Sequence, residues 1–188
     1  MTQRSATQLG AVIVGGGIAR VSAAARMRSV GYEGATLLIG DEPELPCRRP
    51  PVSKEIIRGE KTAEQIRIKP AAGYADNAVE LLTGVHVTSV EPAGLLATGA
   101  PVMLDRLLLA TGGIARTLDS AGIRALRTLA AAPRLHSQPT SGQHLIVVAA
   151  GLIGSEIAAS RMDSVATSHS SRRPRFRCRA CSRRSSAR

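Results

Sequence analysis

The chain has 188 residues, of which 44% are apolar and 2% are aromatic. This composition can bury the core of about one domain, and it excludes a single-stranded nucleic-acid surface built from stacked aromatic rings. No apolar run has the length of a membrane span, and the first residues lack the shape of a signal peptide, so we expect a cytoplasmic protein without membrane contact.

The net charge of +11 is concentrated at one end of the chain. Residues 161–188 contain nine arginines and a single acidic residue, Asp163, whereas the remaining sequence is nearly neutral. A charge asymmetry of this kind often indicates a nucleic-acid-binding arm. We therefore consider residues 161–188 separately, as an Arg/Ser-rich tail.

The first predicted unit is a strand, a glycine loop, a helix and a second strand. Residues 9–14 (LGAVIV) form a short apolar run typical of a strand buried on both faces. Three glycines follow, and the alanine-rich residues 18–30 have the composition of a helix. Residues 35–39 (ATLLI) then predict a strand that ends at Gly40 and Asp41.

Three further segments have distinct patterns. Residues 41–54 contain four prolines, so no regular structure is expected there. Residues 79–109 alternate short apolar runs with turns, which predicts a small β-meander that returns to the main sheet. Residues 145–149 (LIVVA), followed by the helical start LIGSEIAAS, predict a second strand–loop–helix unit.

The first glycine loop has the spacing of a dinucleotide-binding fingerprint. That fingerprint is G-x-G-x-x-G between a strand and a helix, with an acidic residue about 20 residues further on. Gly15 and Gly17 occupy the first two glycine positions, and Asp41 is placed to accept a hydrogen bond from a ribose hydroxyl. Arg20 replaces the third glycine, so its side chain must either extend outward or disturb the packing of helix on strand.

A second loop, VVAAGLIGSE, has Ala149, Gly151 and Gly154 at the three positions. Alanine at the first position requires that the turn keep a negative φ. Two such loops in one chain imply two bound nucleotides, as in a flavoprotein that is reduced by a nicotinamide.

Several segments resemble the FAD-dependent, NAD(P)H-using ferredoxin reductases of the pyridine nucleotide–disulfide oxidoreductase class. The segments, in chain order, are VIVGGGIA, LLIGDEPELPCRRPPVSKEIIRGE, LDRLLLATGG, ALRTLAAAPRL and LIVVAAGLIGSEIAAS. The Pro-Pro-x-Ser-Lys motif is the most specific, since it is not a general feature of dinucleotide-binding folds.

The resemblance implies an α/β architecture. Residues 1–140 would form a Rossmann-like FAD-binding domain of three-layer ββα organisation with a small β-meander. Residues 141–160 would be the incomplete start of a second Rossmann-like domain, for NAD. Family members continue with the rest of the NAD domain, a FAD segment ending in Gly-Asp and an interface domain, so the resemblance implies a truncated chain of doubtful activity.

The resemblance also implies roles for individual residues. The residues carried over as cofactor-binding are Gly15, Gly17, Ala19, Asp41, Arg49, Lys54, Val87, Thr111, Gly112 and Arg127 for FAD, and Gly151 and Gly154 for NAD(P)H. Lys54, beside the flavin, and Glu156, near the nicotinamide and able to pair with Lys54, are the expected catalytic residues. Without the resemblance, Arg49 and Arg127 would be read as solvated surface charges and Glu156 as an acid favoured near a helix start.

The implied activity is electron transfer from NAD(P)H, through FAD, to a ferredoxin or similar iron–sulfur protein. No Cys-x4-Cys follows the first helix, so the disulfide-relay branch of the class is disfavoured. Cys47 is expected to be a free thiol. Cys178 and Cys181 form a single pair, and a zinc site needs four ligands, so no metal site is expected.

The tail permits two interpretations. Back-translation of residues 161–173 allows a shifted reading frame that encodes DGLGRDVTLVEAA. This sequence has the pattern of a helix end followed by a strand, which is what an NAD domain needs at this point. We therefore favour the interpretation that residues 161–188 are translated out of frame. The alternative is a disordered basic tail that contacts nucleic acid or an acidic partner. It would then belong to a nucleotide-binding module without redox activity.

Overall fold

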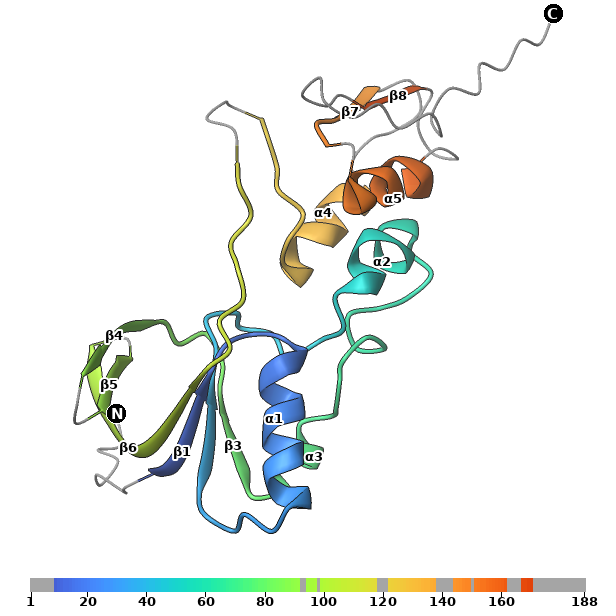
Figure 1. Ribbon diagram of the computed structural model, residues 1–188. Coiled ribbons are helices and arrows are strands. Elements are labelled where there is room, and N and C mark those ends of the chain that lie inside the picture. The colour runs from blue at the N-terminus through green and yellow to red at the C-terminus, as the bar shows by residue number, and fades with distance from the viewer. Residues whose placement is uncertain are drawn as a thin grey trace, which may run out of the picture. The chain divides into compact units, whose positions relative to one another are not determined.

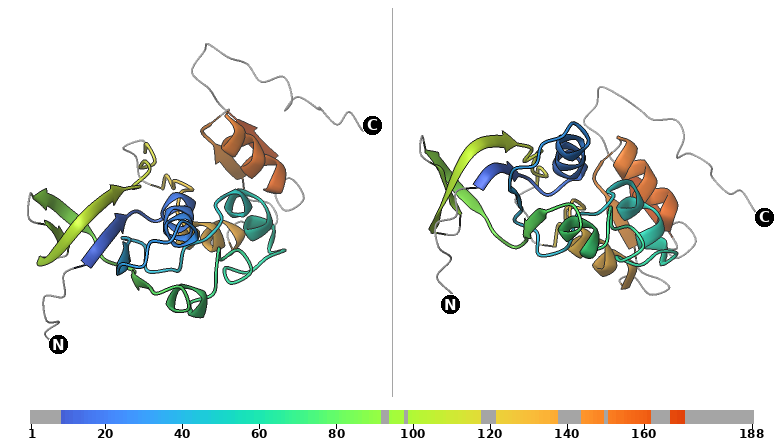
Figure 2. Two further views of the ribbon diagram at one scale, coloured as in Figure 1. Left: turned by 60° about the horizontal axis from the view of Figure 1, so that its bottom comes forward. Right: turned by 90° about the horizontal axis from the view of Figure 1, so that it is seen from below.

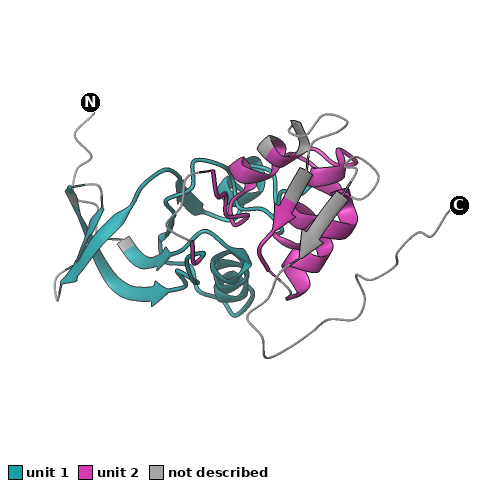
Figure 3. Cartoon of the chain, turned by 90° about the horizontal axis from the view of Figure 1, so that it is seen from above, with its two compact units in different colours: residues 1–48, 66–115 teal, residues 49–65, 116–188 magenta. Residues whose placement is uncertain are grey.

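The computed structural model describes residues 9–91, 94–97, 99–117, 122–137, 144–149, 151–161 and 167–170. The chain forms two compact units, residues 1–48 with 66–115 and residues 49–65 with 116–188 (Figure 3). The predicted domain boundaries, after residues 140 and 160, stay a prediction.

The first unit is built on a six-stranded sheet in the order β3-β2-β1-β6-β5-β4 (Figure 1). The strands are β1 (Leu9–Val14), β2 (Thr36–Ile39), β3 (Val79–Leu82), β4 (Val87–Glu91), β5 (Gly94–Ala97) and β6 (Ala100–Leu109). Strands β3, β2, β1 and β6 run parallel, whereas β4, β5 and β6 pair in antiparallel fashion. The predicted meander is therefore present, and β6 joins it to the parallel strands.

Apolar side chains on both faces of the parallel strands create three layers. On one face, Ile13 and Leu38 pack with Val21 of helix α1 (Ile18–Ser29), together with Tyr74 of the short helix α3 (Ala72–Ala75). On the other face, Val12, Val14, Leu37 and Ile39 pack with Leu95 and Ala97 of β5. Alternate residues of each strand therefore serve opposite layers. This arrangement confirms the predicted α/β fold (Figures 1 and 2).

Arg28 fixes the C-terminal end of α1. Its guanidinium donates hydrogen bonds to the backbone carbonyls of Tyr32 and Gly34, at 2.5 and 2.9 Å. It also donates to the carbonyls of Asn77 and Ala78, both at 2.8 Å. The planar donor fork of arginine suits such divided bonding. One side chain thus joins the end of α1 to the approaches of β2 and β3.

The second unit contains short helices and a two-stranded sheet. Its elements are the 3-10 helices η1 (Pro50–Ser53) and η2 (Leu129–Ala131), the helices α2 (Glu55–Arg58), α4 (Ala132–Ser137) and α5 (Leu152–Arg161), and the strands β7 (His144–Val147) and β8 (Thr167–Ser170). The expectation of no regular structure through residue 54 is wrong at Pro50–Ser53. Proline is tolerated in the first turn of a helix, where the missing N–H has no partner to lose.

Strand β8 lies inside the segment expected to be a tail. It pairs with β7 in parallel, with His144 opposite Thr167 and Val147 opposite Ser170. Helix α5 also extends to Arg161, the first residue of that segment. Residues 171–188 lie outside the described residues, so the origin and the disorder predicted for them stay predictions.

Candidate functional site

The first unit has a cavity of about 390 Å³ at the carboxyl ends of its parallel strands. Open parallel sheets bind ligands in this position. The lining residues are Val14, Gly15, Gly16, Gly40, Asp41, Val85, His86, Val87, Thr88, Ser89, Val90, Leu109, Thr111 and Ile114. The volume lies within the range of small-molecule and cofactor sites, about 300–1,000 Å³.

Backbone hydrogen bonds hold the three loops that begin at these strand ends. The Gly15 N–H donates to the Ile39 carbonyl and the Gly40 N–H to the Leu82 carbonyl, each at 2.9 Å. The Ala110 N–H donates to the Val14 carbonyl at 2.7 Å. The sheet pattern thus continues into the cavity wall and fixes the positions of the lining backbone.

The glycine loop leaves space where a bound phosphate group needs it. Gly15 has φ +151°, and a Cβ atom there would clash with the Ala110 carbonyl oxygen, so only glycine fits. Gly17 precedes α1 in an extended conformation, and no atom lies within 4 Å of the place of its missing Cβ. The N-terminus of α1, where the first N–H groups have no acceptor within the helix itself, suits an anion such as a pyrophosphate.

Arg20 does not extend outward; its side chain is buried, with 1% exposed. A Cβ atom on Gly40 would collide with the Arg20 guanidinium, so this group lies directly against the backbone at the end of β2. Burial raises the pKa of the Tyr74 hydroxyl above its ordinary value, and the nearby Arg20 charge offsets part of this rise. Arg20 therefore occupies the space that the third fingerprint glycine would leave between helix and sheet.

Four residues predicted for FAD line this cavity together: Gly15, Asp41, Val87 and Thr111. Three other predicted residues lie beside it in sequence without being part of the lining. Gly17 and Ala19 belong to the start of α1, and Gly112, with φ +71°, follows Thr111. Their contacts with a cofactor stay predictions.

The sequence interpretation missed several lining residues. Gly16 and Gly40 lie within motifs that were considered, but only their neighbours were assigned roles. His86 and Ser89 belong to the segment after β3, where the sequence shows only alternating apolar and polar residues. That pattern predicts a strand, and it carries no signal for which side chains meet a ligand.

The second unit brings Ser53, Lys54 and Glu156 together. The Lys54 Nζ atom lies 3.0 Å from Oε1 of Glu156, which confirms the geometry of the expected pair. The Ser53 hydroxyl donates to Oε2 of the same carboxylate at 2.5 Å. The Ser53 hydrogen bond first, and the Lys54 contact second, hold the pKa of Glu156 below its ordinary value. Glu156 is therefore an anion held from two sides.

In the loop from β7 to α5, a glycine occupies the third fingerprint position, where the first loop has Arg20. A Cβ atom on Gly154 would lie 2.6 Å from the Ala149 carbonyl oxygen, so α5 passes close to the end of β7. Gly151 has no atom within 4 Å of its missing Cβ. Gly154 thus fits the third fingerprint position, and Gly151 leaves the open space required of the second.

Arg49 and Arg127 also lie in the second unit. The Arg49 guanidinium donates to the backbone carbonyl of Arg127 at 3.1 Å. This bond brings the two predicted FAD residues into one neighbourhood. Their contact with a flavin stays a prediction.

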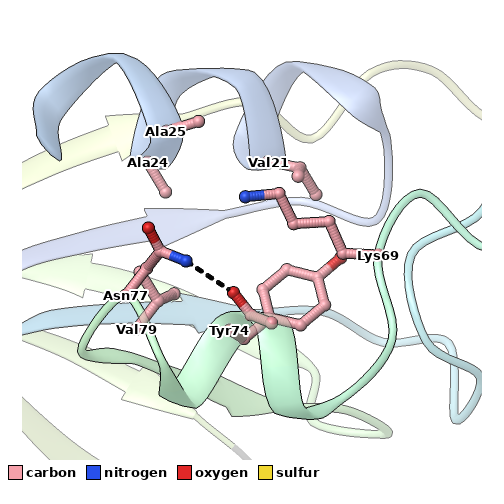
Figure 4. Close-up of a pocket in the computed structure, with 8 residues that line it drawn as sticks. Val21, Ala24, Ala25, Lys69, Tyr74, Asn77 and Val79 are labelled. Atoms are coloured by element: carbon pink, nitrogen blue, oxygen red, sulfur yellow. Dashed lines mark hydrogen bonds between the residues drawn. The ribbon is translucent and has the colours of Figure 1, made fainter. Parts of the chain in front are cut away.

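A smaller cavity lies between α1 and α3 in the first unit. Figure 4 shows Lys69, Tyr74 and Val79 facing Val21 and Ala24 of α1, with the Asn77 side-chain amide bonded to the Gly73 carbonyl at 2.8 Å. Its volume of about 10 Å³ is barely enough for one water molecule. This cavity is therefore a packing defect of the core and too small for a substrate.

Cys47 is a free and buried thiol, as expected. No group of three or more potential metal ligands occurs among the described residues. The described helices include none that is both long and apolar enough to cross a membrane.

Parallel strands, the glycine turn from β1 into α1 and an aspartate after β2 define a dinucleotide-binding protein of the Rossmann type. The chain belongs to the pyridine nucleotide-disulphide oxidoreductase family, whose model matches residues 10–187.

Two curated relatives show the extent of the similarity. Putidaredoxin reductase of Pseudomonas putida is 37% identical over 159 residues, which are 79% of this chain and 38% of that protein. The ferredoxin–NAD(+) reductase component of a biphenyl dioxygenase system from Paraburkholderia xenovorans is 40% identical over 154 residues, 78% of this chain and 38% of that protein. The chain therefore spans well under half the length of these relatives.

Solved structures agree with the sequence comparisons. In the crystal structure of the covalent putidaredoxin reductase–putidaredoxin complex, the similar chain is matched with a TM-score of 0.81 and 34% identity. That match covers 86% of this chain and 42% of the other. A ferredoxin reductase from Rhodopseudomonas palustris gives a TM-score of 0.75 at 31% identity, covering 83% and 41%.

Proposed function

We propose that the cavity of the first unit binds the adenosine diphosphate half of FAD. We further propose that the chain is part of an oxidoreductase that passes electrons from NAD(P)H to a ferredoxin-type iron–sulfur protein. One observation carries the first proposal: Gly15, Asp41, Val87 and Thr111, which come from four separate parts of the sequence, line one cavity. The names of the relatives, ferredoxin reductases, support the second.

Each residue of the first unit has a defined task in this proposal. Gly15 and Gly17 allow the pyrophosphate to approach the backbone, and the N–H groups at the start of α1 bind its oxygens. The Asp41 carboxylate accepts hydrogen bonds from the ribose hydroxyls. Val87 presents backbone to the adenine side. The residues fit the group, except that Arg20 fills the place of the third glycine.

We propose that charged residues of the second unit act on the flavin and the nicotinamide. When bound, these cofactors supply the redox chemistry, and the protein orients them and sets the charge around them. Lys54 provides a positive charge suited to an electron-rich flavin, and Glu156 balances it. Arg49 and Arg127 are proposed to bind FAD, and Gly151 and Gly154 the nicotinamide dinucleotide. We also propose a cytoplasmic location, where NAD(P)H is available as the electron donor.

The proposal is tested by titrating the full chain with FAD and following the quenching of flavin fluorescence. We expect saturable binding that ADP competes away. Asp41→Ala should weaken FAD binding about tenfold, because a charge-assisted hydrogen bond contributes roughly 1.5–3 kcal/mol. Glu33→Ala is the matched control: it removes an exposed acid outside the cavity and should leave the affinity unchanged.

Two results would count against the proposal. Absence of FAD and ADP binding contradicts the assignment of the cavity, as does equal weakening by both variants. FAD binding without NADH-dependent reduction of a ferredoxin-type acceptor contradicts the redox function of this chain. That second outcome supports a nucleotide-binding module without redox activity.

A further inference from the structure

We infer that Ser53 is a positioning residue, whose hydroxyl holds the Glu156 carboxylate on Lys54 and fixes helix α5 to the proline-rich segment. Its relevance to electron transfer rests on the proposed function, in which Lys54 sets the charge beside the flavin. The contacts themselves lie within the second unit and do not depend on a cofactor.

The two oxygens of Glu156 are held by different partners. Lys54 Nζ contacts Oε1 at 3.0 Å, and Ser53 Oγ donates to Oε2 at 2.5 Å. The Ser53 hydroxyl has one proton and a second acceptor nearby, the Pro50 carbonyl, at 3.4 Å. The carboxylate is closer and charged, so it is the acceptor of the Ser53 hydrogen bond, because charge-assisted hydrogen bonds are shorter and stronger than neutral ones.

Burial makes Ser53 the fixed member of the group. The Lys54 and Glu156 side chains are 40% and 32% exposed, and ion pairs of such exposure hold their geometry only weakly. Ser53 is 6% exposed, and its rotation is restricted by the 3-10 helix of which it is the last residue. The short and buried side chain therefore determines where the flexible carboxylate rests.

A second contact joins Ser53 to the same face of α5. The Ser160 hydroxyl donates to the Ser53 backbone carbonyl at 3.1 Å. Ser160 lies four residues after Glu156, and residues with this spacing share one face of a helix. Ser53 thus contacts two consecutive turns of α5 and fixes both its position and its rotation. The helix that begins at the second glycine loop is in this way tied to the residue next to Lys54.

The titration of Glu156 measures this role directly. The carboxylate loses a donor when the hydroxyl is removed, so we expect Ser53→Ala to raise the pKa of Glu156 toward its ordinary value. Ser53→Thr keeps the hydroxyl and should restore the lowered pKa. Lys54, which lowers this pKa, and Glu55, which raises it, are the charged groups of the adjoining segment that act on Glu156. They are unchanged in both variants.

The experiment is carbon-13 NMR of the glutamate carboxyls in the full chain without cofactor, followed over pH. Glu156→Gln identifies the resonance by removing it. Ser29→Ala is the control, since its hydroxyl bonds to the Arg26 carbonyl in the first unit and it should leave the Glu156 curve unchanged. An unchanged Glu156 midpoint in Ser53→Ala, or failure of Ser53→Thr to restore it, would overturn the inference.

A second variant keeps the inference testable if Ser53→Ala does not fold. Lys54→Met leaves the Ser53 bond as the main influence on Glu156, whose pKa should then stay below its ordinary value. A return to the ordinary value in Lys54→Met contradicts the role of Ser53. Because none of these measurements needs FAD, failure here is distinct from failure of the FAD titration.

Discussion

At the scale of single residues, the two glycine loops differ most at their third position. Gly154 lies so close to Ala149 that a side chain would clash with its carbonyl. The corresponding residue of the first loop is Arg20, whose whole side chain is buried against Gly40. The third glycine of the fingerprint lets the helix approach the strand closely, and here the Arg20 side chain fills that space.

We predict that Arg20→Gly increases the affinity for FAD about tenfold. Overpacking of an interior costs about 1–3 kcal/mol, and a gain of 1.4 kcal/mol in binding is a factor of ten. Isothermal titration with FAD measures the change. Arg26→Gly is the control, because it also exchanges an arginine of α1 for glycine, at an exposed position. Unchanged binding by Arg20→Gly would contradict this prediction, and weaker binding would show that the buried cation favours the nucleotide.

The sequence predicts which residues lie at the cavity where a motif fixes both the residue and its backbone; their contacts with a cofactor stay predictions. Gly15 and Asp41 follow from the fingerprint, and they line the cavity. The direction of the Arg20 side chain could not be predicted, since both outward extension and burial are compatible with the sequence. Ser53 was overlooked although it belongs to the most specific motif. Its role depends on a partner more than a hundred positions away in the chain, and no local pattern reports such a contact.

At the scale of elements, short apolar runs were sufficient to predict the strands of the first unit, but not β8 of the second unit. Residues 9–14 form β1 as predicted, and β2 begins one residue later than expected. The 3-10 helix η1 was missed because prolines were treated only as breakers of structure, whereas Pro50 and Pro51 start a turn. Gly40 after β2 and the side chains of the segment after β3 complete the cavity lining. These features depend on how the strands are ordered in the sheet, which local composition does not determine.

The attachment of α5 to η1 should depend on pH. The pKa of Glu156 is lowered in the folded chain, by Ser53 and then by Lys54. A group with a depressed folded pKa stabilises the fold above its ordinary value, near 4.5, and loses that contribution as the pH falls through the folded value. Because the side chain is partly exposed, we expect no more than about 1 kcal/mol.

Urea unfolding of the wild-type chain and Glu156→Gln checks this prediction. The wild type should be the more stable at neutral pH, and the difference should vanish well below the ordinary pKa of glutamate. Glu33→Gln, in the first unit, serves as the reference for unrelated acid effects. A stability difference that grows on acidification would have the wrong sign for a carboxylate with a lowered pKa.

At the scale of the whole molecule, the segment after α5 has a sequence that does not suit its place in the fold. Strand β8 pairs with β7 where a Rossmann-type domain has its next parallel strand. Its sequence, TSHS, has little of the apolar character that such a buried strand normally shows. The shifted frame places VTLV over nearly the same positions, which would supply that character.

The encoding DNA distinguishes the two interpretations of residues 161–188. If translation is out of frame, another frame should continue from Arg161 with an apolar strand ending in an acid and, further on, a Gly-Asp segment. Sequencing through this region and translating all three frames makes the comparison. If no other frame continues in this way, the hypothesis of out-of-frame translation is contradicted. In that case, loss of DNA affinity on deleting residues 161–188 becomes the test of a basic arm.

Strand β6 has a consequence for the order in which the chain can fold. Its first half pairs with β5, and its second half pairs with β1, where Val14 lies opposite Leu109. On a ribosome, β1 emerges first and must remain without this neighbour until α1, β2, β3, β4 and β5 have all been synthesised. Pairings so distant in sequence form slowly and leave strand edges exposed meanwhile. We therefore expect β1 to keep one strand edge unpaired until residue 109 has left the exit tunnel.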